Sequence, residues 1–321
     1  MNRTAQTSIV LASLLAAVMP ARATGPMKVW VAGTGSDLNP CTLAQPCRTF
    51  QHAHDTLAPG GEISVLTPGD YGPLSISMAV SVTNDGAGEA GVYAGPPSEI
   101  AAIYISANRG DVIGLRGLII DGQGVGLEGI AIFGVSAVHI QNSVVRNFSA
   151  GGFCCSFGIA FTVQTSTQLF VSDTAFYNNG EGILIASQLA DSSANVVLDR
   201  VHLDNNVVGL FVNNQATVNT LQVVLRDSIV SGNDGDGIHV QSVAGRPALL
   251  VVEHTAVVNN AGTGLVSDGP HAIILLGGNS IKRNGTGINA INGGQLISYG
   301  NNRNNNNFGA EGVATSTFTP F

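Results

Sequence analysis

The chain has 321 residues, and its 13 Lys and Arg against 21 Asp and Glu give a net charge of −8. This balance argues against a nucleic-acid partner, because phosphate binding needs a basic surface. A hydrophobic share of 44% excludes a disordered chain, and the 41 glycines with few charged residues favour β-structure with many turns.

The first residues are typical of a secretory signal peptide. Asn2-Arg3 is a short basic start, and residues 9–18 form an apolar run, interrupted by Ser13, that is too short to span a bilayer. Ala21-Arg22-Ala23 is an Ala-x-Ala cleavage signal. We therefore expect residues 1–23 to be removed and the protein to be secreted or periplasmic, with a membrane anchor or buried helix as the alternative. No other segment predicts a membrane span.

Residues 24–61 read as a lead-in, with a first strand over residues 28–32. Cys41 and Cys47 bracket a short loop, and four cysteines suit an oxidising compartment. A structural disulfide between these two is favoured over a zinc site, because neither belongs to a Cys-x-x-Cys pair. For the adjacent Cys154 and Cys155, a strained mutual bond and two buried thiols both stay open.

The segment Thr49–Ala58 predicts an amphipathic helix, since apolar residues recur at i, i+3 and i+7 from Phe50. Thr49 can cap its start. A helix here can cover the open end of a stacked β-structure, where apolar residues would otherwise meet water. His52 and His54 are interpreted as surface residues of this helix rather than as a metal pair, because i, i+2 does not place both on one face.

Residues 62–308 contain a repeated unit that ends in Gly followed by Ile or Leu. Successive copies lie 23 to 29 residues apart. A period in the twenties marks a solenoid, and short apolar segments split by polar turns favour a parallel β-helix over leucine-rich repeats or a calcium-binding roll. Residues 309–321 form a tail that we expect either to fray or to fold over the last coil. The repeat glycines are Gly129, Gly158, Gly182, Gly209, Gly237, Gly264 and Gly287.

Three columns run through the repeats. Two are apolar and lie five residues apart in the sequence. Side chains of a strand alternate between its two faces, so residues five apart in one strand would point in opposite directions. The chain must therefore turn a corner between the two columns if both point inward. Three residues later stands an Asn in five copies, which predicts a ladder of amides bonding from coil to coil. Only Asn284, in Asn284-Gly-Thr286, also forms a glycosylation acceptor, so the ladder is preferred. The columns are Val171, Leu198, Leu225, Val252, Leu276; Phe176, Leu203, Val230, Val257, Ile281; and Asn179, Asn206, Asn233, Asn260, Asn284.

Several motifs outside the repeat add a resemblance. They are Asn39-Pro-Cys41, Pro46-Cys-Arg-Thr-Phe50, Ala58-Pro-Gly-Gly-Glu-Ile63, Pro68-Gly-Asp-Tyr-Gly72, Leu115-Arg-Gly-Leu118 and Ser298-Tyr-Gly-Asn-Asn302. With the repeat, they resemble secreted bacterial β-helix repeat proteins of the pectin-lyase-like superfamily. The resemblance implies an all-β fold, a right-handed parallel β-helix with an N-terminal capping helix. Members are often lyases, hydrolases or epimerases of polyuronates and other polysaccharides, and others are binding or adhesive proteins.

The catalytic motifs of such enzymes are not found. Asn233-Asp-Gly-Asp-Gly-Ile-His239 shares Asp and His with polygalacturonase-like hydrolases but not their motif, and Asp268-Gly-Pro-His271 is an interrupted version of the epimerase-like D-P-H-E. The clustered carboxylates of a calcium site are not evident either. No position is therefore assigned a catalytic role, and no cofactor or metal is expected.

One strip of charged residues remains as a candidate ligand site. Acidic, basic and histidine residues occupy the two positions after the first apolar column, and adjacent coils about 4.8 Å apart would stack them. A surface salt-bridge ladder is the favoured interpretation; the alternative is a groove that binds a sugar chain, with Arg116 and Asp121 extending it and aromatic residues of the 148–157 region as a wall. The strip comprises Asp173, Asp199, Arg200, Arg226, Asp227, Glu253 and His254.

Three functions remain as hypotheses. The first is polysaccharide binding through the strip without catalysis, the second is a lyase or hydrolase acting on a polyuronate-like substrate, and the third is a structural or adhesive protein without a ligand. The sequence decides neither whether the protein is an enzyme nor its oligomeric state.

Overall fold

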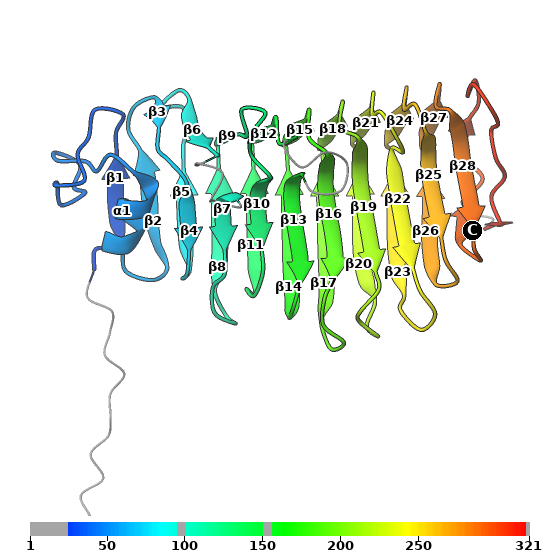
Figure 1. Ribbon diagram of the computed structural model, residues 1–321, viewed down its shortest axis with the longest axis horizontal. Helices are drawn as coiled ribbons and strands as arrows, with labels where there is room; N and C mark the ends of the chain where they lie inside the picture. Colours follow the sequence, from blue (N-terminus) through cyan, green and yellow to red (C-terminus); the bar gives the residue numbers. More distant parts are fainter. Residues whose placement is uncertain (1–24, 95–100, 150–155, 319–321) are drawn as a thin grey trace, which may run out of the picture.

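A computed structural model describes residues 25–94, 101–149 and 156–318. Its strands form three parallel sheets, here called A, B and C, which have 12, 10 and 9 strands in the described part of the chain. From β2 to β28 the chain visits A, B and C in turn. Each strand from β2 to β27 pairs with the strand three positions later, and the coils stack along one axis (Figure 1). The predicted parallel β-helix is confirmed; the predicted signal peptide and Cys154-Cys155 lie outside the described residues.

Each sheet collects one short strand from nearly every coil. Sheet A holds β1 (Lys28–Val31), β2 (Gly61–Val65), β5 (Val80–Thr83), β8 (Val112–Arg116), β11 (Ala137–Gln141), β14 (Ser166–Ser172), β17 (Ser193–Asp199), β20 (Leu221–Arg226), β23 (Ala248–Glu253), β26 (Ala272–Gly277), β29 (Gln295–Ser298) and β31 (Ser316–Thr317). Sheet B holds β3 (Gly69–Asp70), β6 (Ala90–Tyr93), β9 (Ile119–Asp121), β12 (Val144–Arg146), β15 (Ala175–Tyr177), β18 (His202–Asp204), β21 (Ile229–Ser231), β24 (Ala256–Val258), β27 (Ser280–Lys282) and β30 (Arg303–Asn304). Sheet C holds β4 (Leu74–Ile76), β7 (Ala101–Ile105), β10 (Glu128–Ile132), β13 (Phe157–Val163), β16 (Glu181–Ser187), β19 (Val208–Asn214), β22 (Ile238–Ser242), β25 (Thr263–Asp268) and β28 (Thr286–Ile291).

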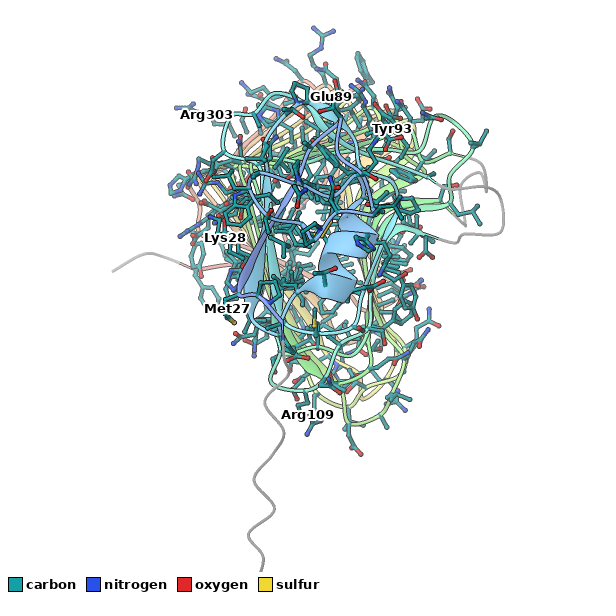
Figure 2. The ribbon with its side chains drawn as sticks, turned by 90° about the vertical axis from the view of Figure 1, so that its left-hand side faces the viewer. Met27, Lys28, Glu89, Tyr93, Arg109 and Arg303 are labelled. Atoms are coloured by element: carbon teal, nitrogen blue, oxygen red, sulfur yellow. A yellow bond between two sulfur atoms is a disulfide. The ribbon has the colours of Figure 1, made fainter. Side chains whose placement is uncertain are left out.

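The helix α1 (Phe50–Thr56) covers the N-terminal end of the stack. The side chain of Thr49 caps it by accepting a hydrogen bond from the backbone N–H of His52 at 3.2 Å. Phe50 and Ala53 are fully buried against the first coils, and in Figure 2 the helix lies across the end of the solenoid. The predicted cap and its apolar face are confirmed. This helix is too short and polar to cross a membrane, and the described residues contain no helix that could.

Two features beside the cap complete this end. Cys41 and Cys47 form the predicted disulfide. His54 differs from the expectation of a surface residue: it is 3% exposed, its Nδ1 lies 3.1 Å from Asp55, and its Nε2 accepts a hydrogen bond from the backbone N–H of Ser77. Its ring is buried because the helix rests on the first turns through this side as well.

The corner predicted between the two apolar columns exists. Leu198 and Leu203 are both fully buried, and Arg200 between them has φ of +51°. This left-handed conformation turns the chain so that both columns point inward despite their odd spacing. The same conformation recurs at the equivalent positions Asp173, Asp227 and His254.

The Asn ladder is confirmed and is longer than predicted. Each side-chain Nδ2 of Asn179 to Asn260 donates to the Oδ1 of the next ladder Asn at 2.8 to 3.3 Å. The same Oδ1 accepts from the backbone N–H of the preceding ladder residue. Asn284 is fully buried and passes the ladder on to Asn307 at 3.1 Å.

The repeat glycines stand where successive coils approach most closely. A Cβ on Gly209 would lie 2.5 Å from the carbonyl oxygen of Gly237, and Gly129 to Gly264 share this geometry at 2.5 to 2.8 Å. Atoms this close clash, so a larger residue would force adjacent coils apart. Glycine therefore keeps the ladder asparagines within hydrogen-bond distance.

The C-terminal tail folds over the last coil. β31 pairs with β29, and the backbone N–H of Gly287 donates to the carbonyl of Ala310 at 2.8 Å. The described part of the tail therefore caps the last coil, which is one of the two outcomes expected from the sequence.

Candidate functional site

The charged strip follows sheet A at its junction with sheet B. Asp199, Arg226 and Glu253 end three neighbouring strands and stand in register with one another. Asp173, Arg200, Asp227 and His254 occupy the adjacent left-handed corner. The predicted stacking of these residues is therefore present.

Most of the strip is held by its own ion pairs. Arg200 donates through Nε and Nη2 to both carboxylate oxygens of Asp173 at 2.7 and 2.9 Å, and through Nη1 to Asp199. Arg226 donates to Asp199 at 3.0 Å, and His254 lies 4.0 Å from Asp227. The hydrogen bonds from Arg200 lower the pKa of Asp173, which burial opposes.

The strip borders a small hollow. A hollow of about 330 Å³ beside it includes Asp173 and Arg200. Arg116 lies in the same column and forms an ion pair with Asp85, but Asp121 stands in sheet B, bound to Arg146 at 2.7 Å. The extension of the strip proposed from the sequence thus reaches one of those two residues.

A larger recess lies on the outer face of sheet C, over β13, β16, β19 and β22. Its volume is about 600 Å³. Strand alternation explains its wall. Ile183 and Leu210 point inward, so the residues that follow them, Leu184 and Phe211, face outward, and His239 stands in register with them on the next strand. The lining residues are Phe157, Glu181, Leu184, Ala186, Val208, Phe211, Asn213, Gly235, Asp236, His239 and Gln241.

Glu181 is the most unusual residue of the recess. It immediately precedes the repeat glycine and stands in register with Phe157 on one side and Val208 on the other. Only 5% of it is exposed. Because these apolar neighbours exclude water, burial raises the pKa of its carboxyl to about 7, although the charge of His239 acts in the opposite direction.

His239 is held by carboxylates. Its Nδ1 lies 3.1 Å from Oδ2 of Asp236, whose other oxygen accepts a hydrogen bond from the backbone N–H of Thr263 at 2.7 Å. Its Nε2 lies 3.7 Å from Asp268. The ring packs edge-on against Phe211, with centroids 5.3 Å apart. These contacts fix the position of the imidazole, and its Nε2 is buried without a hydrogen-bond partner.

Unpaired polar atoms gather in this recess. In the described part of the chain, four buried side-chain nitrogen or oxygen atoms have no hydrogen-bond partner. Three of them belong to recess residues: Oε2 of Glu181, Oδ1 of Asn213 and Nε2 of His239. The fourth is Oε2 of Glu128, two coils away from Glu181 and outside the lining. Since leaving a buried polar atom unpaired is costly, this concentration distinguishes the recess from the rest of the described structure.

Comparison with known proteins agrees with this architecture. A family model described as a right handed beta helix region matches residues 98–245. The chain is a right-handed parallel β-helix of the pectin-lyase-like fold. No curated protein sequence matches it.

Three solved structures are similar to this β-helix at low sequence identity. An alginate lyase from Paenibacillus sp. str. FPU-7 has a TM-score of 0.57 and 11% identity, with 92% of this chain and 98% of that chain covered. The pectate lyase Pel9A has a TM-score of 0.55 and 13% identity, covering 91% and 78%. A rhamnogalacturonan lyase has a TM-score of 0.50 and 13% identity, covering 84% of both chains. These likenesses establish the fold.

Metal ligands do not cluster in the recess of this β-helix. Among the described residues, one group of three potential ligand side chains lies close together, and it is Cys41, Cys47 and His52 at the N-terminal end. The two sulfur atoms of that group are bonded to each other in the disulfide, so it offers no thiolate pair.

Sequence reasoning missed the recess although its residues carry a signal. Asp236, His239 and Asp268 lie in the two segments set aside because they lack known motifs. The residue that precedes the repeat glycine differs between coils. It is acidic in two of them, Glu181 and Asp236, and apolar in two others, Phe157 and Val208. Of the aromatic residues proposed as a groove wall, Phe157 lines the recess and Phe148 is buried in the core; Phe153 lies outside the described residues.

Proposed function

We propose that this β-helix binds a polysaccharide chain in the recess of sheet C. The observation that carries the proposal is the set of three unpaired polar atoms, from Glu181, Asn213 and His239, in a recess that Phe157 and Phe211 also line. Sugar rings present hydroxyl groups at their edges and apolar faces between them, which complement both features. An open recess on a sheet face also suits a chain better than a small enclosed molecule.

Binding is tested with a panel of soluble polysaccharides that contains uronic chains (polygalacturonate, alginate, rhamnogalacturonan) and uncharged chains (a β-glucan, a galactan, a mannan). We expect at least one to bind, measured by isothermal titration calorimetry. Phe211→Ala should weaken that binding about fivefold, because it removes an aromatic contact worth about 1 kcal/mol.

The matched control is Phe170→Ala. Phe170 is also a partly buried aromatic on an outer face, but it lies on β14 of sheet A, where it stacks on His139. Its removal should leave the affinity unchanged. A wild-type protein that binds none of the panel, or an equal effect of both substitutions, would contradict the proposal.

The charged strip stays a second candidate surface for the same ligand. The register of its residues and the hollow of about 330 Å³ at Asp173 and Arg200 favour contact with a polysaccharide chain. The ion pairs among these residues, however, leave fewer of their polar groups free to bind a sugar. Replacing Arg200 and Arg226 together by Gln separates the two surfaces. Lost affinity in that variant with retained affinity in Phe211→Ala would place the ligand at the strip.

Export to the periplasm or the medium forms part of the proposal. The Cys41–Cys47 disulfide suits an oxidising compartment, and polysaccharides of the kinds named above are extracellular. Expression of the full chain in a bacterial host, followed by fractionation and mass spectrometry, should find a product that begins at Thr24 outside the cytoplasm. A full-length product confined to the cytoplasm would refute export.

A further inference from the structure

The column that precedes the repeat glycines alternates between acidic and apolar residues. In register it reads Glu128, Phe157, Glu181, Val208 and Asp236 on successive coils. Each acidic residue therefore lies two coils from the next, with an apolar side chain between them. Two of the three, Glu181 and Asp236, line the recess. A reaction assigned to these two residues rests on the proposed function, because it names the substrate class and the chemistry of that same recess.

Glu181 has the properties of a proton donor. It lines the recess although it is almost fully buried, and its Oε2 is withdrawn from the surface and has no hydrogen-bond partner. A carboxyl whose burial raises its pKa to about 7 keeps its proton at near-neutral pH. The charged groups near it are His239, Asp236 and, on the other side of Phe157, Glu128.

Asp236 is the second acidic residue that lines the recess. Both of its oxygens are held in the wall of the recess: Oδ1 accepts a hydrogen bond from the backbone N–H of Thr263, and Oδ2 lies 3.1 Å from Nδ1 of His239. Two coil spacings place its backbone about 10 Å from that of Glu181. Inverting glycosidases hold their two carboxyl groups about 6.5–9.5 Å apart, a span comparable with two coil spacings.

The charge of the recess selects against acidic chains. Asp236 and the adjoining Asp268 face His239, which is the one basic side chain of the lining, and neither Lys nor Arg is among the described lining residues. Glu181 adds no charge while it holds its proton. A polyuronate carries a carboxylate on every residue, which this surface would repel. Elimination at a uronate also needs a cationic group to stabilise the sugar carboxylate, whereas an uncharged sugar has no acidic C5 proton to remove.

We propose that the recess hydrolyses glycosidic bonds of an uncharged polysaccharide, with Glu181 as general acid and Asp236 as general base. Glu181 gives its proton to the glycosidic oxygen as the bond from that oxygen to the anomeric carbon breaks. A solvent water attacks the anomeric carbon from the opposite face and loses a proton to Asp236. One water is consumed, two shorter chains form, and the new reducing end has the inverted configuration. The carboxyl groups return to their starting states by proton exchange with solvent.

The experiment measures binding and release of reducing ends for each polysaccharide of the panel. The variants are Glu181→Gln and Asp236→Asn, with Glu128→Gln as matched control. Glu128 is a glutamate of the same column, is also withdrawn from water and also has an unpaired Oε2, but it does not line the recess. Far-ultraviolet circular dichroism and calorimetry on each variant establish that it is folded and binds.

We expect the wild type to bind and cleave an uncharged chain and to give a product whose anomeric proton signals show inversion. Glu181→Gln and Asp236→Asn should each lower the rate at least 100-fold while Kd changes less than threefold, and Glu128→Gln should retain the wild-type rate within threefold. An uncharged chain that binds without being cleaved would overturn the inference and leave the proposed function standing. Binding restricted to uronic chains, unsaturated products, or equal rates in wild type and Glu181→Gln would also overturn it. No binding to any chain would refute the proposed function itself.

Discussion

The charged strip and the sheet C recess lie on the same coils yet treat charge in opposite ways. In the strip, Arg200 is about half exposed and satisfies two aspartates, so each charge has both water and an opposite charge nearby. In the recess, Glu181 is buried between Phe157 and Val208 and has an oxygen without a partner. The number of charged residues is thus a poor guide to a site; unpaired and desolvated groups are a better one.

The largest effect should come from the scaffold that both regions share. Asn233→Ala removes an amide that accepts from Asn206 and donates to Leu203 and Asn260. It leaves several buried groups without partners, so we expect the free energy of unfolding to fall by about 4 kcal/mol. Urea denaturation followed by circular dichroism measures this. The exposed Asn195→Ala is the control, and a comparable loss there would show that the ladder is not special.

A smaller effect, confined to the recess, should appear in the pH dependence of stability. The pKa of Glu181 is raised from 4.5 to about 7 in the folded state. Between those values the folded protein retains a proton that the unfolded chain has released, so this residue lowers stability as pH rises from about 4.5 to about 7.

Glu181→Gln removes that dependence. Relative to wild type, the variant should gain about 3 kcal/mol of stability between pH 4 and pH 8, the amount that corresponds to such a shift. Urea denaturation of both proteins at the two pH values gives the difference. A constant difference between the proteins would mean that Glu181 has an ordinary pKa and that the contrast with the strip is unfounded.

The smallest effect should come from the strip. Arg226→Ala breaks the ion pair with Asp199, but half of the arginine side chain is in solvent, so the expected loss is about 0–1 kcal/mol and shrinks in high salt. Thermal unfolding at low and high salt tests this. A loss above 2 kcal/mol that salt does not reduce would show that the strip is a structural element in its own right.

Much of the fold is encoded in local sequence pattern. The columns of Leu198 and Leu203, the corner between them and the ladder through Asn206 are each specified within one repeat, because a side chain's inward or outward direction depends on its place in the strand. The helix that begins after Thr49 arises from the same kind of periodicity. The burial of His54 does not follow from periodicity, because it depends on how the helix packs against the first coils.

The recess was beyond the reach of such patterns. Glu181, Asp236 and His239 lie on different coils, and only the length of each coil and the strand register bring them to one surface. Burial of Glu181 depends further on Phe157 and Val208, which are its neighbours in space and not in sequence. By itself, the sequence determined a capped, parallel β-helix with an Asn ladder, because those features repeat within each coil. Only the tertiary structure decided which polar residues lose water and remain unpaired, because desolvation is set by neighbours on adjacent coils.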